Sequence, residues 1–266
     1  MTHRSSLLNL LSVILMFLLL PACGAIHKSP SLTEAPKGPV DEKAIQVMSR
    51  LASGNELLNS FKGLGRVTIE ESHRKISLRI AFAGVYPDRL RFSVMDVSGR
   101  VIETFACDGR SIYLMSHQGD HAFIHKKKDP KTLEKILSVP MPPEELIGLL
   151  TGRPWFGAYE RAARIDMPRG MTRIDLFKKN RVLTALILSS DEKLQSITPY
   201  DKKSRALYQI ILSRYQSFDG YVIPSRIDIR KNRTTGLRIE SVQYWPNAVI
   251  TPGIFILSDE TEAPLP

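Results

Sequence analysis

Alternating hydrophobic and polar residues dominate the chain from residue 76 onward. In segments 76–82 and 90–94 every second side chain is apolar, and this period of two predicts β-strands with one apolar face. Turn signals such as Asp108-Gly109 separate neighbouring strands, and strands joined by tight turns form an antiparallel meander. The other predicted strands are residues 101–107, 111–116, 121–125, 171–177, 181–188, 207–215, 221–230 and 237–244.

Short helices interrupt this pattern. Residues 41–52 carry an apolar stripe at helical spacing, and residues 57–61 prolong its apolar character into a second short segment. Segments 129–137 and 142–150 begin with prolines, which are typical of a first helical turn. No alternation of strand, helix and strand appears, which disfavours a doubly wound nucleotide-binding fold. The prediction is a mainly β domain at 41–260, with about 10–11 strands and a frayed tail at 261–266. Two packed sheets and one strongly curved sheet both satisfy the pattern.

The N-terminal segment has the features of an export signal. Residues 1–22 combine a positive start with an apolar run at 7–20, which is short for a membrane span. The run ends in Leu-Pro-Ala-Cys, which resembles the bacterial lipobox, so we predict lipid attachment (diacylglyceryl and palmitate chains) at Cys23. The alternative is a plain signal peptide with a chance cysteine. Residues 23–40 are predicted to be a flexible tether. Gly24, where an Asp would favour retention in the inner membrane, points to an outer-membrane lipoprotein facing the periplasm.

Composition narrows the classes of protein. The 266 residues are 43% hydrophobic and 24% charged, which excludes a wholly disordered chain and a multi-span membrane protein. Two cysteines are too few for a disulfide scaffold or a Cys-rich zinc domain. The net charge of +10 does not indicate nucleic-acid binding in an exported protein whose aromatic residues are not interleaved with basic ones.

No catalytic motif stands out. Val97-Ser98-Gly99 lacks the spacing of a nucleophile elbow, and paired carboxylates and phosphate-binding glycine loops are missing from the sequence. We therefore predict a non-enzymatic protein without cofactor or metal. Three sets of residues have both a structural and a functional interpretation. Cys107 is either a buried hydrophobe or a thiol nucleophile, and His117, His121 and His125 are either solvated or metal-binding. Lys126–Lys128 form either a solvated loop or a site for anionic headgroups.

Five segments resemble the LolA/LolB-like bacterial lipoprotein carriers and receptors, and most closely their lipoprotein members of unassigned function. The segments are FKGLG (61–65), YPDRLRF (86–92), DVSG (96–99), CDGRSIYL (107–114) and PMPPEEL (140–146). The resemblance implies a half-closed antiparallel barrel with a helical lid over an apolar cavity that binds acyl chains. Receptor members also have a protruding loop that touches the membrane, and its counterpart here, Asp96 to Arg100, offers only Val97.

These observations define the expected site. The helix at 41–52 is expected to act as a lid through Ile45, Met48 and Leu51. The expected cavity-lining residues are Ile80, Phe82, Leu90, Phe92, Val94, Phe105, Ile112 and Leu114, and the same residues would also suit a filled core. The leading hypothesis is a lipid-anchored carrier or receptor that binds acyl chains of lipoproteins or lipids and aids their placement at the outer membrane. The alternatives are an accessory lipoprotein that binds a protein partner in an envelope complex and, more distantly, a hydrolase.

Overall fold

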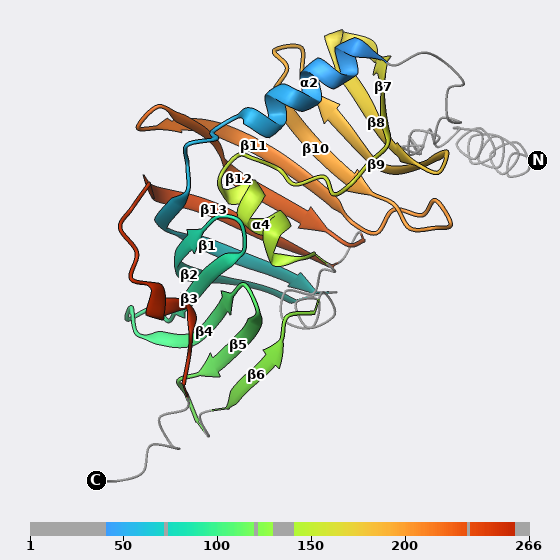
Figure 1. Ribbon diagram of the computed structural model, residues 1–266. Coiled ribbons are helices and arrows are strands. Elements are labelled where there is room, and N and C mark those ends of the chain that lie inside the picture. The colour runs from blue at the N-terminus through green and yellow to red at the C-terminus, as the bar shows by residue number, and fades with distance from the viewer. Residues whose placement is uncertain (1–40, 72–73, 120–121, 130–140, 233–234, 259–266) are drawn as a thin grey trace, which may run out of the picture. The chain divides into compact units, whose positions relative to one another are not determined.

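The chain folds around one antiparallel sheet (Figure 1). The computed structural model describes residues 41–71, 74–119, 122–129, 141–232 and 235–258. Thirteen strands within these residues follow the order β6-β5-β4-β3-β2-β1-β13-β12-β11-β10-β9-β8-β7. The edge strands β6 and β7 do not pair with each other, so the sheet stays open. The prediction of a mainly β, strongly curved antiparallel half-barrel with short helices is confirmed.

The first six strands form one meander and the last seven form another. The first comprises β1 (Ser60–Glu71), β2 (Arg74–Val85), β3 (Arg89–Met95), β4 (Val101–Asp108), β5 (Ser111–Ser116) and β6 (Phe123–Lys127). The second comprises β7 (Arg161–Asp166), β8 (Thr172–Lys178), β9 (Arg181–Leu188), β10 (Leu194–Pro199), β11 (Gln209–Phe218), β12 (Tyr221–Arg230) and β13 (Thr235–Pro246). The helical elements are α2 (Glu42–Ser53), α4 (Pro143–Leu150) and the 3-10 turns η1 (Pro168–Gly170) and η2 (Pro252–Phe255).

The connection between the two meanders positions a helix over the sheet. The chain leaves the first meander at the β6 edge and enters the second at the opposite edge, β7. This connection must therefore cross the sheet, and its described part carries α4 (Figure 1). Leu146 and Leu149 of α4 and Ala44 and Met48 of α2 belong to one hydrophobic core, so both helices pack on the same, inner face.

Aromatic rings fill part of the inner face. Phe61 stacks on Tyr244 with ring centroids 5.6 Å apart, and the Phe82 ring lies 6.1 Å from that of Phe61. Glycine makes room for these rings, since a Cβ on Gly63 would lie 2.2 Å from Phe82 Cζ. Dense ring packing of this kind contributes hydrophobic burial at this end of β1 and β2.

The C-terminal segment covers part of the outer face. Arg91 Nη1 donates a hydrogen bond of 2.8 Å to the Ile254 carbonyl, and Leu257 packs with Ala106 and Tyr113. Ala106 alternates with the inward-facing Phe105, so this small cluster lies on the opposite side of β4 from the main core.

The structure has more strands than the ten or eleven predicted. Residues 57–61 do not continue the first helix, because β1 begins at Ser60. The signal for β1 is weak, since two glycines occupy inward positions that elsewhere carry apolar side chains. β7 and β10 were also not predicted, because each is only six residues long and polar in part.

Several predicted segments lie outside the described residues. They are the signal peptide at 1–22, the tether at 23–40, all but the first residue of the helix at 129–137, and the tail at 261–266. The predicted strand at 121–125 is observed as β6, which is shifted toward the C-terminus by two residues.

Candidate functional site

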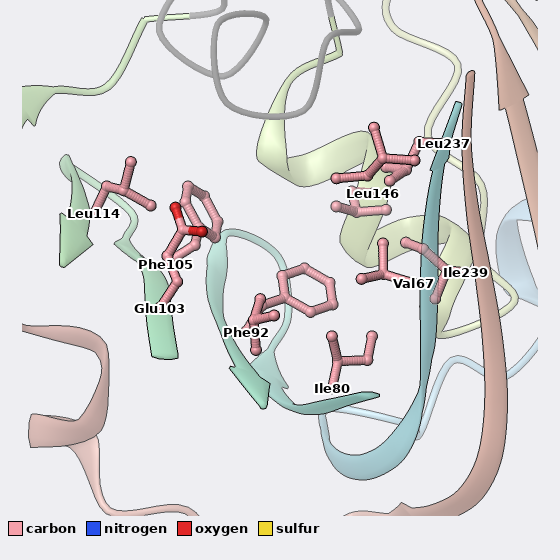
Figure 2. A pocket seen from close by; sticks show the side chains of 11 residues that line it. Val67, Ile80, Phe92, Glu103, Phe105, Leu114, Leu146, Leu237 and Ile239 are labelled. Carbon is pink, nitrogen blue, oxygen red and sulfur yellow. The ribbon is translucent and has the colours of Figure 1, made fainter. Parts of the chain in front are cut away.

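An apolar cavity of about 90 Å³ lies between the inner face of the sheet and α4 (Figure 2). Its floor comes from six neighbouring strands, and Leu146 of α4 projects into it from above. Ten of its eleven lining residues are aliphatic or aromatic. The lining residues are Val67, Ile69, Ile80, Phe92, Val94, Glu103, Phe105, Leu114, Leu146, Leu237 and Ile239.

Strand register brings these side chains together. Ile80 pairs with Val94 across β2 and β3, and Phe105 pairs with Leu114 across β4 and β5. On the other side, Val67 of β1 pairs with Ile239 of β13. Cross-strand partners share a face of the sheet, so the alternation within each strand builds a continuous apolar surface.

The structure divides the predicted cavity residues into two groups. Ile80, Phe92, Val94, Phe105 and Leu114 line the cavity. Phe82, Leu90 and Ile112 are buried in the core and do not line it. The sheet therefore contains a filled part and a hollow part, which the sequence pattern does not distinguish.

The cavity is small for a ligand site. Pockets that hold small molecules usually measure about 300–1,000 Å³, whereas a water molecule takes about 30 Å³ of liquid. The volume of about 90 Å³ is below that range. A long apolar ligand would therefore extend past the solvent-exposed edge at Glu103 or displace one of the walls.

Among the described lining residues, Glu103 is the one acidic group. Its side chain lies at the edge, where it still reaches solvent. Partial burial beside the apolar wall raises its pKa. A negative charge at this position disfavours an anionic ligand group at the same edge.

Helix α4 forms the wall opposite the sheet. Pro142 precedes it and Pro143 occupies its first turn, which suits the fixed φ of proline. Gly148 lets the following chain fold back tightly, because a Cβ there would lie 2.5 Å from the Arg153 carbonyl oxygen. The helix is buried along nearly all of its length and has only eight residues, so packing rather than intrinsic propensity keeps it in place.

Polar contacts fix both ends of α4. Near its start, the Tyr208 hydroxyl donates a hydrogen bond to the buried carboxylate of Glu145, and burial raises the pKa of Glu145 to about 7. At its end, Tyr244 Oη donates to the Leu150 carbonyl at 3.0 Å. Breaking these contacts would leave buried polar groups without partners, which is costly. No local sequence pattern indicates these contacts, because Tyr208 is 63 residues from Glu145 and Tyr244 is 94 residues from Leu150.

A second cavity of about 160 Å³ lies on the other side of α4. Leu149 of α4 and Leu51 of α2 line it, together with Leu212 and Tyr215 of β11. Leu146 faces the first cavity and Leu149 the second, so α4 separates two hollow regions of the inner face.

A third hollow, of about 520 Å³, opens beside the start of α4. It is lined by Tyr86, Pro87, Lys128, Pro142, Pro143, Glu144 and Trp155. Lys128 forms an ion pair with Glu144 and lies 3.7 Å from Asp88, so this lysine is held in the fold. Lys126 and Lys127 are exposed on β6.

The expected lid helix does not cover the first cavity. In α2, Met48 is buried and Leu51 lines the second cavity, but Ile45 is 47% exposed. The helix contacts β7, and Asp41 at its N-cap accepts a hydrogen bond from the Arg164 backbone. None of Ile45, Met48 and Leu51 lines the first cavity, and the lid role expected of this helix stays a prediction. α4 covers the first cavity instead, because the edge-to-edge connection runs across it.

Cys107, His117 and His125, for which the sequence also allowed a chemical role, are buried or contact other side chains of the fold. Cys107 is fully buried, and burial raises the pKa of its thiol to about 11, which opposes formation of a reactive thiolate. His117 hydrogen-bonds with the Thr104 hydroxyl, and His125 stacks on Tyr113. Across the described ranges, no three His, Cys, Asp or Glu side chains are placed to hold a metal ion. His121 and Cys23 lie outside the described residues.

The loop from Asp96 to Arg100 is well ordered by hydrogen bonds. One Asp96 carboxylate oxygen accepts from the backbone amides of Ser98 and Arg100. Val97 at its tip is almost completely exposed. Among the described residues, no helix combines the length and apolar character that a membrane span requires.

Comparison with solved structures identifies the fold. A LolA superfamily protein from Nitrosomonas europaea aligns over 80% of this chain and 97% of its own, with a TM-score of 0.54 and 13% identity. The chain has a LolA-like fold. A domain from Vibrio parahaemolyticus, described as an outer membrane lipoprotein-sorting protein, covers 80% of this chain with a TM-score of 0.57 and 10% identity, and 96% of that domain is aligned.

A third structure, a DUF1329 family protein from Desulfovibrio piger, has a TM-score of 0.58 and 11% identity and covers 81% of this chain and 96% of its own. No family model matches the sequence, and no curated protein matches it. These proteins therefore share the fold of this chain at 10–13% sequence identity.

Proposed function

We propose that the protein is a non-enzymatic, lipid-anchored carrier or receptor that binds the acyl chains of lipoproteins or lipids. The observation that carries this proposal is the apolar cavity beneath α4 on the inner face of a LolA-like sheet. The Vibrio parahaemolyticus domain, which shares the fold, is named as an outer membrane lipoprotein-sorting protein, and this supports a role in placing lipoproteins at the outer membrane. The protein then faces the periplasm from that membrane.

Acyl-chain burial supplies the driving force. Each methylene group transferred from water to an apolar site contributes about 0.8 kcal/mol. Because the first cavity is small, we expect a longer chain to displace α4 and reach toward the second cavity. The free energy of moving α4 is subtracted from the affinity, and a loosely favoured closed state therefore suits repeated uptake and release.

The charge of Glu103 affects which type of acyl ligand is preferred. Its carboxylate at the cavity edge repels the carboxylate of a free fatty acid. An ester- or amide-linked acyl chain has no such charge. Lipoproteins and membrane lipids are therefore better ligands in this proposal than free fatty acids.

Filling the cavity tests the proposal. Val67→Phe adds four carbon atoms to the cavity wall, and we expect it to reduce binding of a fluorescent acyl probe at least tenfold with little loss of stability. Val101→Phe is the matched control, because Val101 is an exposed residue on β4 that does not line the cavity. Equal binding by both variants and the wild type would contradict an acyl site under α4.

A second candidate is an accessory lipoprotein that uses the same fold to bind a protein partner in an envelope complex. The filled part of the inner face, where Phe61, Phe82 and Tyr244 pack together, is consistent with it. This candidate predicts that neither the wild type nor the Val67→Phe variant binds acyl probes.

The lipid anchor at Cys23 is a separate part of the proposal. Cys23→Ser removes the thiol that would carry the diacylglyceryl group, and we expect the variant to appear as an uncleaved precursor or a soluble protein. Membrane fractionation after a high-salt wash, with labelled palmitate as a second readout, measures the change. A processed variant that remains with the washed membranes would show that another feature anchors the protein.

A further inference from the structure

The outer face of β1 and β13 carries an exposed group of apolar and basic side chains. We call the following residues the outer patch: Lys62, Leu64, Arg66, Arg79, Val242 and Trp245. Leu64 is 39% exposed, Trp245 47% and Val242 71%. These values are high for large apolar side chains on a sheet.

Strand geometry places the outer patch opposite the cavity. Phe61 packs inward on Tyr244, so the alternate residues Lys62 and Leu64 project outward. Lys62 pairs with Trp245 across the two strands, and Arg66 lies between Arg79 of β2 and Glu240 of β13. A register shift between Leu64 and Gly65 leaves Val242 without a partner on β1, which increases its exposure.

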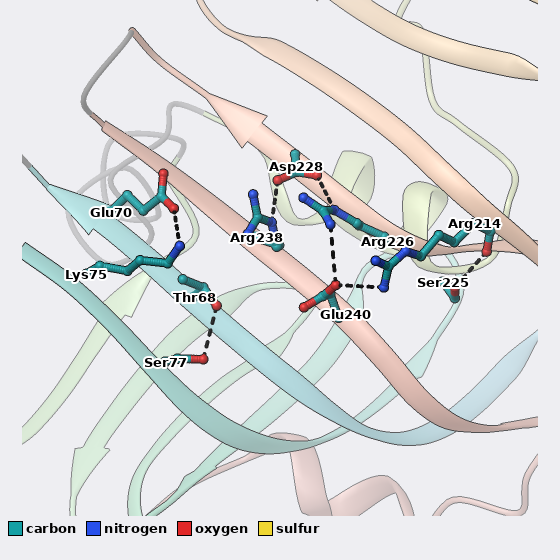
Figure 3. A network of polar contacts seen from close by, with 10 residues as sticks. All are labelled: Thr68, Glu70, Lys75, Ser77, Arg214, Ser225, Arg226, Asp228, Arg238 and Glu240. Carbon is teal, nitrogen blue, oxygen red and sulfur yellow. Dashed lines mark hydrogen bonds and ion pairs between the residues drawn. The ribbon is translucent and has the colours of Figure 1, made fainter.

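The charges on this face are unevenly balanced. Its acidic groups are already paired, since Asp228 contacts Arg226 and Arg238 at 2.7 and 2.6 Å (Figure 3). Glu240 lies 3.2 Å from Arg214, and Glu70 lies 3.2 Å from Lys75.

Lys62, Arg66 and Arg79 of the outer patch form no ion pair with any other described residue. The face therefore has an excess of positive charge around its exposed apolar side chains. That combination attracts an anionic surface with an apolar interior.

We propose that the outer patch binds the surface of an anionic lipid bilayer. Tryptophan is enriched at the interface between membrane and water, where basic side chains contact anionic headgroups. The cores of protein interfaces, by contrast, group apolar residues together and are depleted of lysine. Here Lys62 lies directly beside Trp245, an arrangement that suits mobile headgroups better than a fixed protein surface.

The patch would orient the domain on the membrane. With the outer face on the bilayer, the inner face with α4 and both cavities points away from it. The proposed tether of residues 23–40 reaches about 60 Å when extended, so it permits this orientation without enforcing it. This inference goes beyond the proposed function and does not depend on acyl binding in the cavity.

The two tryptophans of the chain, Trp155 and Trp245, allow a direct test. The full chain is reconstituted into vesicles of brominated phosphatidylcholine, with or without phosphatidylglycerol. In the Trp155→Phe variant, which retains Trp245, we expect at least twofold quenching of fluorescence with phosphatidylglycerol and much less without it. The matched Trp245→Phe variant retains Trp155 beside the third hollow and is expected to remain unquenched.

A charge reversal separates the contribution of the patch from simple proximity to the membrane. Lys62→Glu with Arg66→Glu, made in the Trp155→Phe background, is expected to abolish the quenching, and circular dichroism checks that the fold is kept. Absence of Trp245 quenching, or quenching that survives the charge reversal, would overturn the proposal. So would protection of Trp245 in whole envelopes but not in lipid vesicles, which would indicate an acidic protein partner. Acyl-probe binding, measured in parallel, reports separately on the proposed function.

Discussion

Phe92→Asp is expected to unfold the protein, whereas Val94→Asp, two residues along the same strand, is expected to abolish acyl binding in a folded protein. Phe92 is buried, with its ring centroid 6.1 Å from that of Phe82 and 6.4 Å from that of Phe105. Loss of a buried phenylalanine costs about 3–5 kcal/mol. A carboxylate left without a partner in its place costs more. That sum is comparable to the total stability of a domain, which is about 5–15 kcal/mol.

Val94 differs because it lines the same cavity but is only half-buried. An aspartate there can reach solvent at the edge, beside Glu103, so the fold should persist while the apolar surface is interrupted. Ser93→Asp is the matched control on the opposite face of β3 and should keep both fold and binding. Circular dichroism and an acyl-probe titration measure the two properties. Folded Phe92→Asp protein with normal binding would refute the position of the cavity.

Glu145→Gln is expected to remove a fall in stability between about pH 4.5 and 7. Burial raises the pKa of Glu145 from 4.5 to about 7 in the folded protein. Between these values the folded protein holds a proton that the unfolded chain has lost, so wild-type stability is fully present below pH 4.5 and falls as the pH rises to 7. The expected fall in wild-type stability is about 3 kcal/mol, and above pH 7 this loss stays constant. Because the glutamine side chain does not ionise, the variant does not show this fall.

Urea unfolding at intervals from pH 4.5 to 8 measures this difference. The carboxylates whose pKa is lowered, such as Asp108 and Asp228, affect stability mainly below this range. Glu42→Gln on the exposed side of α2 is the control and should follow the wild type. A Glu145→Gln variant with the wild-type pH profile would show that Glu145 ionises without penalty.

The period of two predicted ten of the thirteen described strands and five of the eleven residues that line the cavity. Ile80, Phe92, Val94, Phe105 and Leu114 come from strands that follow one another in sequence, so local alternation and tight turns determine which face they share. The other wall was not predictable in this way. Val67 and Ile239 meet only because β1 pairs with β13, and no local pattern indicates a ladder between residues so far apart.

The helix that covers the first cavity is not indicated by the sequence, for a related reason. Amphipathic spacing indicates that α2 packs on the sheet, but it does not indicate which strands lie beneath it. The position of α4 depends on the order of the strands, which places β6 and β7 at opposite edges. Its contact with Tyr208 is likewise a consequence of topology.

The ladder between β1 and β13 also affects the order in which the chain can fold. β1 lies in the middle of the sheet, yet one of its two neighbours is β13, the last strand among the described residues. An N-terminal meander that forms first has an unpaired β1 edge until residues 235–246 are available. Such non-local pairing slows folding, and an open edge can pair with another chain. Newly made protein is therefore most exposed to aggregation before its last strand is added, and truncation within β13 should be more harmful than its terminal position suggests.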